Sequence, residues 1–112
     1  MIKILACGIS KYEGADNLSF CVNDAKEFCK AFDENIIVDQ INNFSGNGEI
    51  RKKEYNKIFK KFCKEANNKD ILIYFHSGHG GIDKYGKSVL QLTDDVIYID
   101  KIVKMLNGKR FI

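Results

Sequence analysis

The 112-residue sequence has no proline, no tryptophan, and no apolar run long enough to cross a membrane. The missing proline and tryptophan say little about function. The missing apolar run argues against a membrane-spanning protein, and the first residues lack the charged-then-apolar pattern of a signal peptide. Because Met1 directly precedes an apolar segment, we expect no leading pro-segment. The sequence predicts no membrane partner and a cytoplasmic location.

The four cysteines form no C-x-x-C pair, and no histidine lies at zinc-site spacing from them. This pattern fits reduced thiols in a cytosolic protein better than a disulfide framework. Cysteine packs well as a small hydrophobe. We therefore expect Cys29 and Cys63, which fall at helical apolar positions, to be buried in the core, and Cys7 to be buried in the first strand.

Neither sign of charge is in large excess, since 18 basic and 15 acidic residues leave a formal net charge of +3. A balance this small does not predict a nucleic-acid partner. The densest basic stretch, Arg51 to Lys64, alternates with apolar residues at helical spacing, which is typical of the solvated face of an amphipathic helix. With 45% hydrophobic residues, the chain can bury a core within one domain of modest size.

What the sequence does contain is an alternation of strand-like and helix-like segments. Apolar periodicity predicts a helix that begins at Leu18, with Asn17 or Ser19 as its cap. It also predicts helices over 49–66 and 96–106. Strands are expected over 1–9, 35–41, 71–75 and 88–92, with a hairpin-like turn over 81–87 and a further strand beginning at 109. This order predicts an α/β domain, with a mainly parallel sheet flanked by helices on both faces. We expect this domain to be incomplete at its carboxyl end.

The most informative stretch is DILIYFHSGHGG, from Asp70 to Gly81. A short run of branched and aromatic residues that ends in glycines is typical of a buried parallel strand. The glycines allow a sharp turn and place His79 just beyond the carboxyl end of the strand. In open α/β sheets, ligands bind at that edge. We therefore predict that His79 is a catalytic residue.

Three segments of this sequence, taken together, resemble the caspase-like cysteine peptidases, most closely their metacaspase branch. The first is the loop Ser10-Lys11-Tyr12-Glu13-Gly14, which follows the opening strand. The second is the L-x-x-C-x-N-D-A motif, from Leu18 to Ala25, and the third is Y-x-x-S-G-H-G, from Tyr74 to Gly80. The resemblance covers nearly the whole chain in the expected order and implies a caspase-like fold.

By this resemblance, His79 is the general base and acid of a Cys/His dyad, and the N–H of Gly80 is one oxyanion donor. A histidine suits that role because imidazole titrates near neutral pH and activates a thiol as a nucleophile. The resemblance also places Cys21, Asp24 and Ser77 in the primary specificity pocket. A carboxylate there favours Arg or Lys before the scissile bond. The implied partner is therefore a polypeptide substrate.

The family's nucleophilic cysteine follows the next strand, in a motif like D-x-C-x-S-G, and none of the four cysteines here occupies that place. The resemblance therefore implies that the nucleophile lies beyond this chain, which alone is expected to be inactive. It also implies that this chain pairs with a missing carboxyl-terminal half or with itself. The alternative hypothesis is a catalytically inactive caspase-like module that binds or regulates a partner.

Metal ions are not predicted. Many metacaspases bind calcium through aspartates that follow the histidine, and this chain offers Asp83, Asp94, Asp95 and Asp100. Lys101 stands where a second aspartate would help, and calcium needs six to eight oxygen ligands. His76 and His79 form an H-x-x-H pair, but their sequence context supplies no third ligand.

Non-catalytic interpretations stay open for two of these residues. His79 would also be compatible with a structural histidine that satisfies its hydrogen bonds inside the fold. Asp24 would also be compatible with a simple helix-terminus role, since carboxylates are favourable near helix amino ends.

Overall fold

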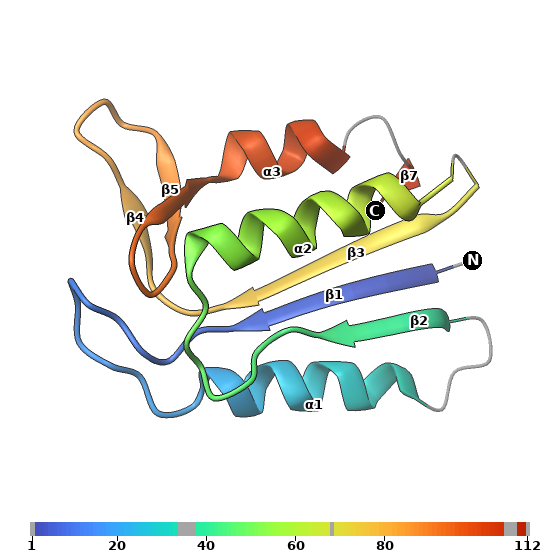
Figure 1. Cartoon of the computed structure of the whole chain (residues 1–112), viewed down its shortest axis with the longest axis horizontal. Coiled ribbons are helices and arrows are strands. Elements are labelled where there is room, and N and C mark those ends of the chain that lie inside the picture. The colour runs from blue at the N-terminus through green and yellow to red at the C-terminus, as the bar shows by residue number, and fades with distance from the viewer. Residues whose placement is uncertain (1, 34–37, 68, 107–109, 112) are drawn as a thin grey trace.

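The computed structural model describes residues 2–33, 38–67, 69–106 and 110–111. Its elements form a larger four-stranded sheet and a smaller three-stranded sheet, with three helices (Figure 1). In chain order they are β1 (Ile2–Gly8), α1 (Cys21–Asp33), β2 (Val38–Asn43), α2 (Lys52–Glu65), β3 (Ile71–Ser77), β4 (Gly80–Ile82), β5 (Ser88–Gln91), β6 (Val96–Tyr98), α3 (Ile99–Leu106) and β7 (Arg110–Phe111).

The larger sheet is entirely parallel in its described part, with the strand order β2-β1-β3-β7. Its central pair, β1 and β3, is in register from Ile2↔Ile71 to Gly8↔Ser77. Parallel strands need crossover connections. Helix α1 connects β1 to its neighbour β2, and α2 connects β2 to β3, on the other side of β1. The predicted α/β class with a mainly parallel sheet is confirmed.

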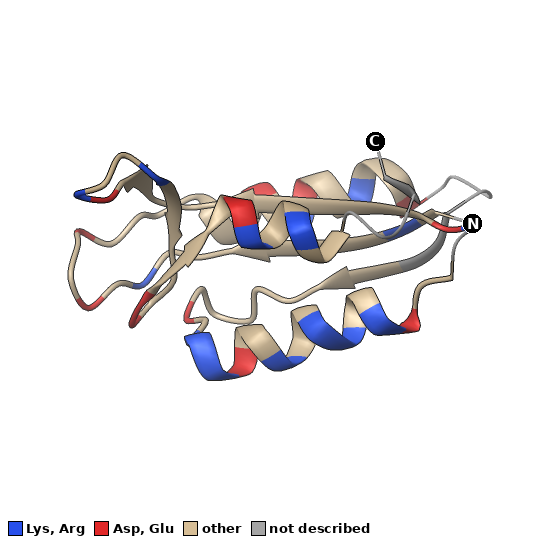
Figure 2. Cartoon of the chain, turned by 90° about the horizontal axis from the view of Figure 1, so that it is seen from above, with Lys and Arg blue, Asp and Glu red and all other residues tan. Residues whose placement is uncertain are grey.

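Helices cover both faces of this sheet, as predicted (Figures 1 and 2). On one face, Ala25 and Cys29 of α1 pack against Ala6, and the ring of Phe28 stacks on Phe75 at a centroid distance of 4.2 Å. The opposite face belongs to α2 and α3, whose apolar side chains join residues of β1 and β3 in one larger core. Consistent with burial on both sides, four consecutive residues of β1, from Ile4 to Cys7, are completely buried.

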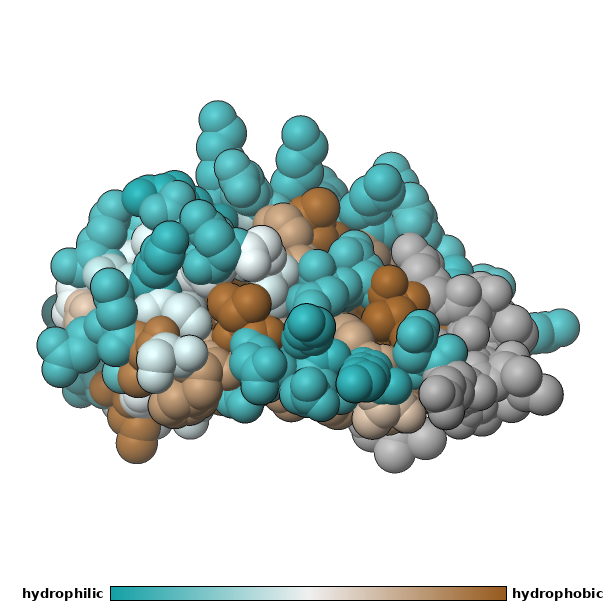
Figure 3. Space-filling model, turned by 90° about the horizontal axis from the view of Figure 1, so that it is seen from below, coloured by the Kyte–Doolittle hydropathy of each residue, from teal (hydrophilic) through white to brown (hydrophobic). Residues whose placement is uncertain are grey.

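The lysine-rich segment forms the predicted amphipathic helix. Tyr55 and Phe59 of α2 are buried, whereas its lysines lie on the solvent side, visible as a row of blue residues (Figure 2). Seen from below, the surface is largely hydrophilic, and apolar residues appear as small separate areas (Figure 3). Within the described residues, none of the helices combines the length and apolarity that a membrane crossing requires.

Several element boundaries differ from the sequence prediction. Helix α1 begins at Cys21 rather than Leu18, and Asn17 does not cap it, because its side-chain oxygen accepts a hydrogen bond from the Tyr12 N–H instead. Helix α2 begins at Lys52 rather than at residue 49, because Arg51 at its N-cap has an extended backbone conformation. Strand β2 extends to Asn43, and the start of the predicted strand at 35–37 lies outside the described residues.

The largest difference concerns the predicted helix over 96–106. Its first three residues form β6, which pairs antiparallel with β5 through Val89↔Tyr98 and Gln91↔Val96, and α3 starts only at Ile99. Branched and aromatic residues favour the extended state, and here the strand partner outweighs a helical pattern that was continuous in the sequence. A hairpin turn joins β4 to β5, but Gly81 and Ile82, which the prediction over 81–87 placed in the turn, belong to β4. These strands project beyond the carboxyl ends of β1 and β3 (Figure 1).

Candidate functional site

The candidate site lies at the carboxyl ends of the two central parallel strands. Gly8 ends β1 beside Ser77, which ends β3, and the Ile9 N–H donates a 2.9 Å hydrogen bond to the Ser77 carbonyl. The loop that follows β1 and the turn that follows β3 therefore start side by side. Adjacent strands that end together create a crevice above the sheet edge, where ligands bind in α/β folds.

The three residues predicted to line a specificity pocket meet at this edge. The Ser77 hydroxyl donates a 2.8 Å hydrogen bond to Oδ2 of Asp24, which lies in the first turn of α1. Both side chains are half-buried, whereas Cys21 is completely buried. A Cβ at Gly8 would overlap the main-chain carbonyl of Cys21. Glycine at this position therefore lets the amino end of α1 lie directly against the end of β1.

His79 is held from three directions. Its Nε2 lies 2.7 Å from the carbonyl oxygen of Asp16, its main-chain N–H donates to the Tyr12 hydroxyl at 2.9 Å, and its carbonyl accepts from the Gln91 N–H. Since a carbonyl oxygen only accepts, Nε2 must carry the proton in this contact. In the neutral ring, that tautomer leaves Nδ1 with the lone pair, so Nδ1 is the basic nitrogen.

The contacts of Tyr12 were not predicted from the sequence, although Tyr12 lies in the Ser10 to Gly14 loop that resembles the caspase-like peptidases. Besides accepting from His79, its hydroxyl donates a 2.7 Å hydrogen bond to the Ile9 carbonyl. Its ring lies against the His79 ring, with a centroid distance of 4.6 Å. A Cβ at Gly78 would overlap the Tyr12 hydroxyl, so this glycine makes room for the contact.

The main-chain N–H of Gly80 lies outside the ladder between β4 and β5. Gln91 donates to the carbonyl of His79, and Asp83 donates to the carbonyl of Lys87, which marks the 79↔91 and 83↔87 pairs as the hydrogen-bonded ones. In an antiparallel ladder such pairs alternate with pairs that exchange no bonds. Gly80↔Leu90 directly follows the hydrogen-bonded 79↔91 pair and is therefore a pair that exchanges no bonds. The N–H of Gly80 thus points away from β5.

His76 is chemically separate from this site. It is partly buried on the α2 side of β3, its Nδ1 lies 2.8 Å from the Tyr74 hydroxyl, and that hydroxyl accepts from Tyr55. Burial lowers the pKa of His76 to about 4, so the ring is neutral at physiological pH. Its Nε2 is buried without a hydrogen-bond partner. The two histidines of the H-x-x-H pair are therefore engaged with different partners.

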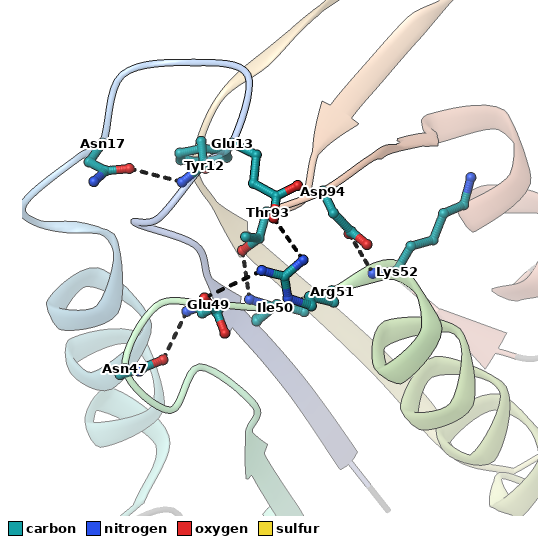
Figure 4. Close-up of polar contacts among 10 residues, drawn as sticks. All are labelled: Tyr12, Glu13, Asn17, Asn47, Glu49, Ile50, Arg51, Lys52, Thr93 and Asp94. Atoms are coloured by element: carbon teal, nitrogen blue, oxygen red, sulfur yellow. Dashed lines mark hydrogen bonds and ion pairs between the residues drawn. The ribbon is translucent and has the colours of Figure 1, made fainter.

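A polar network fixes the loop after β1 to the start of α2 and to the loop after β5 (Figure 4). The Ile50 N–H donates to the Thr93 hydroxyl, and the Thr93 N–H donates to the Ile50 carbonyl, both at 2.9 Å. The Thr93 carbonyl accepts from the Glu13 N–H. Arg51 adds an exposed ion pair with Glu13 at 2.9 Å. Thr93 is almost completely buried, so it is the main anchor that holds this loop in place.

The aspartates considered for calcium mostly have partners within the fold. The Asp83 carboxylate accepts from the main chain at Tyr85 and Lys87, and from the Tyr98 hydroxyl. Asp94 accepts from the Lys52 N–H, and Asp95 pairs with the Lys52 side chain at 3.4 Å. Among the residues with described positions, no cluster of three or more His, Cys, Asp or Glu side chains is arranged to hold a metal ion.

Comparison with solved structures identifies proteins of the same fold. Protein GSU0716 from Geobacter sulfurreducens superposes with a TM-score of 0.77 at 18% identity, over 97% of this chain and 45% of that one. Caspase-1 from Spodoptera frugiperda superposes with a TM-score of 0.70 at 13% identity, over 98% of this chain and 46% of that one. The chain thus spans about half the length of these two proteins. No curated protein matches it in sequence.

The predicted caspase-like fold is confirmed by these superpositions. Assignment to the metacaspase branch stays a prediction from the motifs. The sequence itself matches the family described as "Caspase domain" over residues 2–112, which is all of the chain except its first residue. The chain therefore belongs to the caspase-domain family.

Proposed function

We propose that this chain is the histidine-bearing part of a cysteine endopeptidase. The observation that carries the proposal is the contact between Nε2 of His79 and the Asp16 carbonyl, which leaves Nδ1 as the basic nitrogen. A base in this state takes the proton of a thiol as the thiolate attacks the peptide carbonyl, and returns it to the leaving amine. The Gly80 N–H, directed away from β5, would stabilise the developing oxyanion.

The nucleophilic cysteine of this proposal lies beyond residue 112. All four cysteines of the chain are buried, and burial raises the pKa of Cys7 to about 12 and raises that of Cys29. A buried, protonated thiol is a poor nucleophile. Strand β7 pairs in parallel with the start of β3, through Leu72↔Phe111. A strand continuing in that direction would run toward the edge that carries His79, which is where a partner thiol is needed.

Substrate preference is proposed to come from Asp24. Its carboxylate would form charge-assisted hydrogen bonds with Arg or Lys at the residue preceding the scissile bond. The hydroxyl of Ser77 holds one carboxylate oxygen in place, and Cys21, the first residue of α1, is completely buried. The dyad requires no cofactor, and the partner we propose is a polypeptide in the cytoplasm.

The burial of all four cysteines also supports a second candidate function. A chain without an accessible thiol would serve as an inactive caspase-like module that binds or regulates another protein. In that case the hydrogen bonds around His79 would be structural.

A cleavage assay on the protein at its full natural length distinguishes the two functions. Fluorogenic peptides that end in Arg or in Asp are compared, with and without calcium, and His79→Ala is the matched variant. We expect cleavage after Arg, none after Asp, and loss of activity in His79→Ala. A well-folded protein that cleaves neither peptide would favour the inactive module.

A further inference from the structure

Strand β4 directly follows His79 and is an edge strand of the small sheet, which has the order β4-β5-β6. The alternation that directs the Gly80 N–H away from β5 applies again two residues later. Ile82 faces Ser88 in a pair that exchanges no ladder bonds, since the flanking 83↔87 pair carries the bond from Asp83 to Lys87. The main-chain N–H and C=O groups of Gly80 and Ile82 therefore both point to the open side of β4.

In the part of the chain that the structure describes, neither backbone conformation nor packing requires glycine at the first two positions of this strand. Among the described residues, positive φ angles occur at Gly46, Gly48 and Gly86 and not in β4. A Cβ at Gly81 would meet no atom within 4 Å, and one at Gly80 would make only ordinary contacts with Val89 and Leu90. Glycine weakens a strand, and in strands it often marks a place where another backbone approaches closely.

The surface of β4 is also free to receive a partner. All three of its residues are exposed, and the side chain of Ile82 is 71% exposed, although apolar. An exposed edge with unpaired polar groups is a template for an additional strand. Because this edge begins at the residue after His79, any strand that pairs with it continues into the candidate site.

From these observations we propose that the open edge of β4 binds the main chain of an extended polypeptide substrate, which adds a strand to the small sheet. In this register the Gly80 N–H bonds the scissile carbonyl, and Ile82 pairs with the substrate two residues further along. The inference rests on the proposed peptidase function and extends it from the dyad to the binding of the substrate backbone. It makes β4 a determinant of affinity that is independent of the Asp24 pocket.

Amide hydrogen exchange measured by NMR on the full-length His79→Ala protein tests this proposal, because the variant binds a peptide without cleaving it. The probe is an eight-residue peptide with one central arginine. We expect the amides of Gly80 and Ile82 to exchange fast in the free protein and to slow roughly tenfold or more with saturating peptide, as one hydrogen bond each would require. The amides of Gly81 and Asp83, which already lie in the ladder, are the internal controls and should not change.

A variant tests the same edge through kinetics. Ile82→Pro removes an N–H that makes no ladder bond, and proline is tolerated at such edge positions, so the hairpin should persist. We expect KM to rise about tenfold in Ile82→Pro and to stay unchanged in the control Ile82→Val, which keeps the N–H. Should Ile82→Pro fail to fold, the exchange measurement on Gly80 and Ile82 still decides the question.

The outcomes separate this inference from the proposed function. Cleavage after Arg without protection at Gly80 and Ile82, or with equal protection across residues 80–83, would overturn the docking edge and leave the peptidase intact. Protection that grows with protein concentration in the absence of peptide would show that a second copy occupies the edge, and would also overturn it. If the peptide neither binds nor is cleaved, both proposals are wrong.

Discussion

Ser77 and Asp24 are 53 positions apart in the sequence, and the Ser77 hydroxyl donates a 2.8 Å hydrogen bond to Oδ2 of Asp24. The bond joins the end of β3 to the first turn of α1. A carboxylate in the first turn of a helix is stabilised by the helix dipole, and the hydroxyl fixes its orientation. The Asp24 carboxylate is thereby held against Ser77, which precedes His79 by two residues in the sequence.

The free-energy cost of Asp24→Asn should therefore be larger in the cleavage of Arg peptides than in unfolding. Loss of a charge-assisted pair costs about 1.5–3 kcal/mol, so kcat/KM for Arg peptides should fall roughly tenfold to a hundredfold. The matched control is Asp33→Asn, at the exposed carboxyl end of the same helix, which should leave kcat/KM unchanged. Equal activity of Asp24→Asn and the wild type on Arg peptides would assign Asp24 a purely structural role.

The sequence predicted the parallel sheet, its helices and the place of His79 just beyond the carboxyl end of β3, because those features follow from apolar periodicity, the glycines after the strand and chain order. It did not predict β6, because the apolar residues from Val96 to Leu106 have continuous helical spacing. Only the pairing with β5 distinguishes the first three residues, which form β6, from α3. The role of Tyr12 was hidden for a related reason. Its hydroxyl bonds to Ile9 and His79, and the contact with His79, 67 positions away, leaves no periodic pattern in the sequence.

Tyr12→Phe tests whether that hydroxyl positions His79. The substitution leaves the His79 N–H and the Ile9 carbonyl without their partner, so unfolding free energy should fall by about 1–3 kcal/mol. Because the His79 ring would be less well placed, kcat should fall while KM changes little. Tyr85→Phe, at a tyrosine that is 76% exposed, is the control and should match the wild type in denaturant unfolding and in kcat. A Tyr12→Phe protein with lowered stability but unchanged kcat would show that Tyr12 serves the fold only.

His76 predicts a specific dependence of stability on pH. Burial lowers its pKa from 6.5 to about 4, so between these values the unfolded state binds a proton that the folded state does not. Stability should therefore be highest above pH 6.5 and should fall as the pH drops toward 4, by about 3 kcal/mol in total. Urea unfolding at pH 7 and pH 4.5 measures this loss.

His76→Phe is the control for that measurement, because an apolar ring at the same position cannot titrate. Its loss of stability between pH 7 and pH 4.5 should be smaller than that of the wild type by about 2–3 kcal/mol. The carboxylates with lowered pKa values, Asp70, Asp83 and Asp95, titrate below this window and affect both proteins alike. The same pH dependence in both proteins would mean that His76 is protonated in the folded state at pH 4.5.

The last prediction concerns the edge of β3 that faces β7. Among the described residues, β3 has a strand partner on that side at Ile71 and Leu72 and none from Ile73 to Ser77. Such an edge readily pairs with another strand. We therefore expect the 112-residue chain on its own to self-associate, and its mass by light scattering should rise with concentration.

Amide exchange identifies the strand responsible. Amides of Ile73 to Ser77 on that edge should become more protected as concentration rises, because association covers them. The internal control is β1, which lies between β2 and β3 and should be protected at every concentration. A mass that stays monomeric across the whole concentration range, with fast exchange on the β3 edge, would contradict this prediction. It would mean that the short contact with β7 is enough to protect the sheet from pairing.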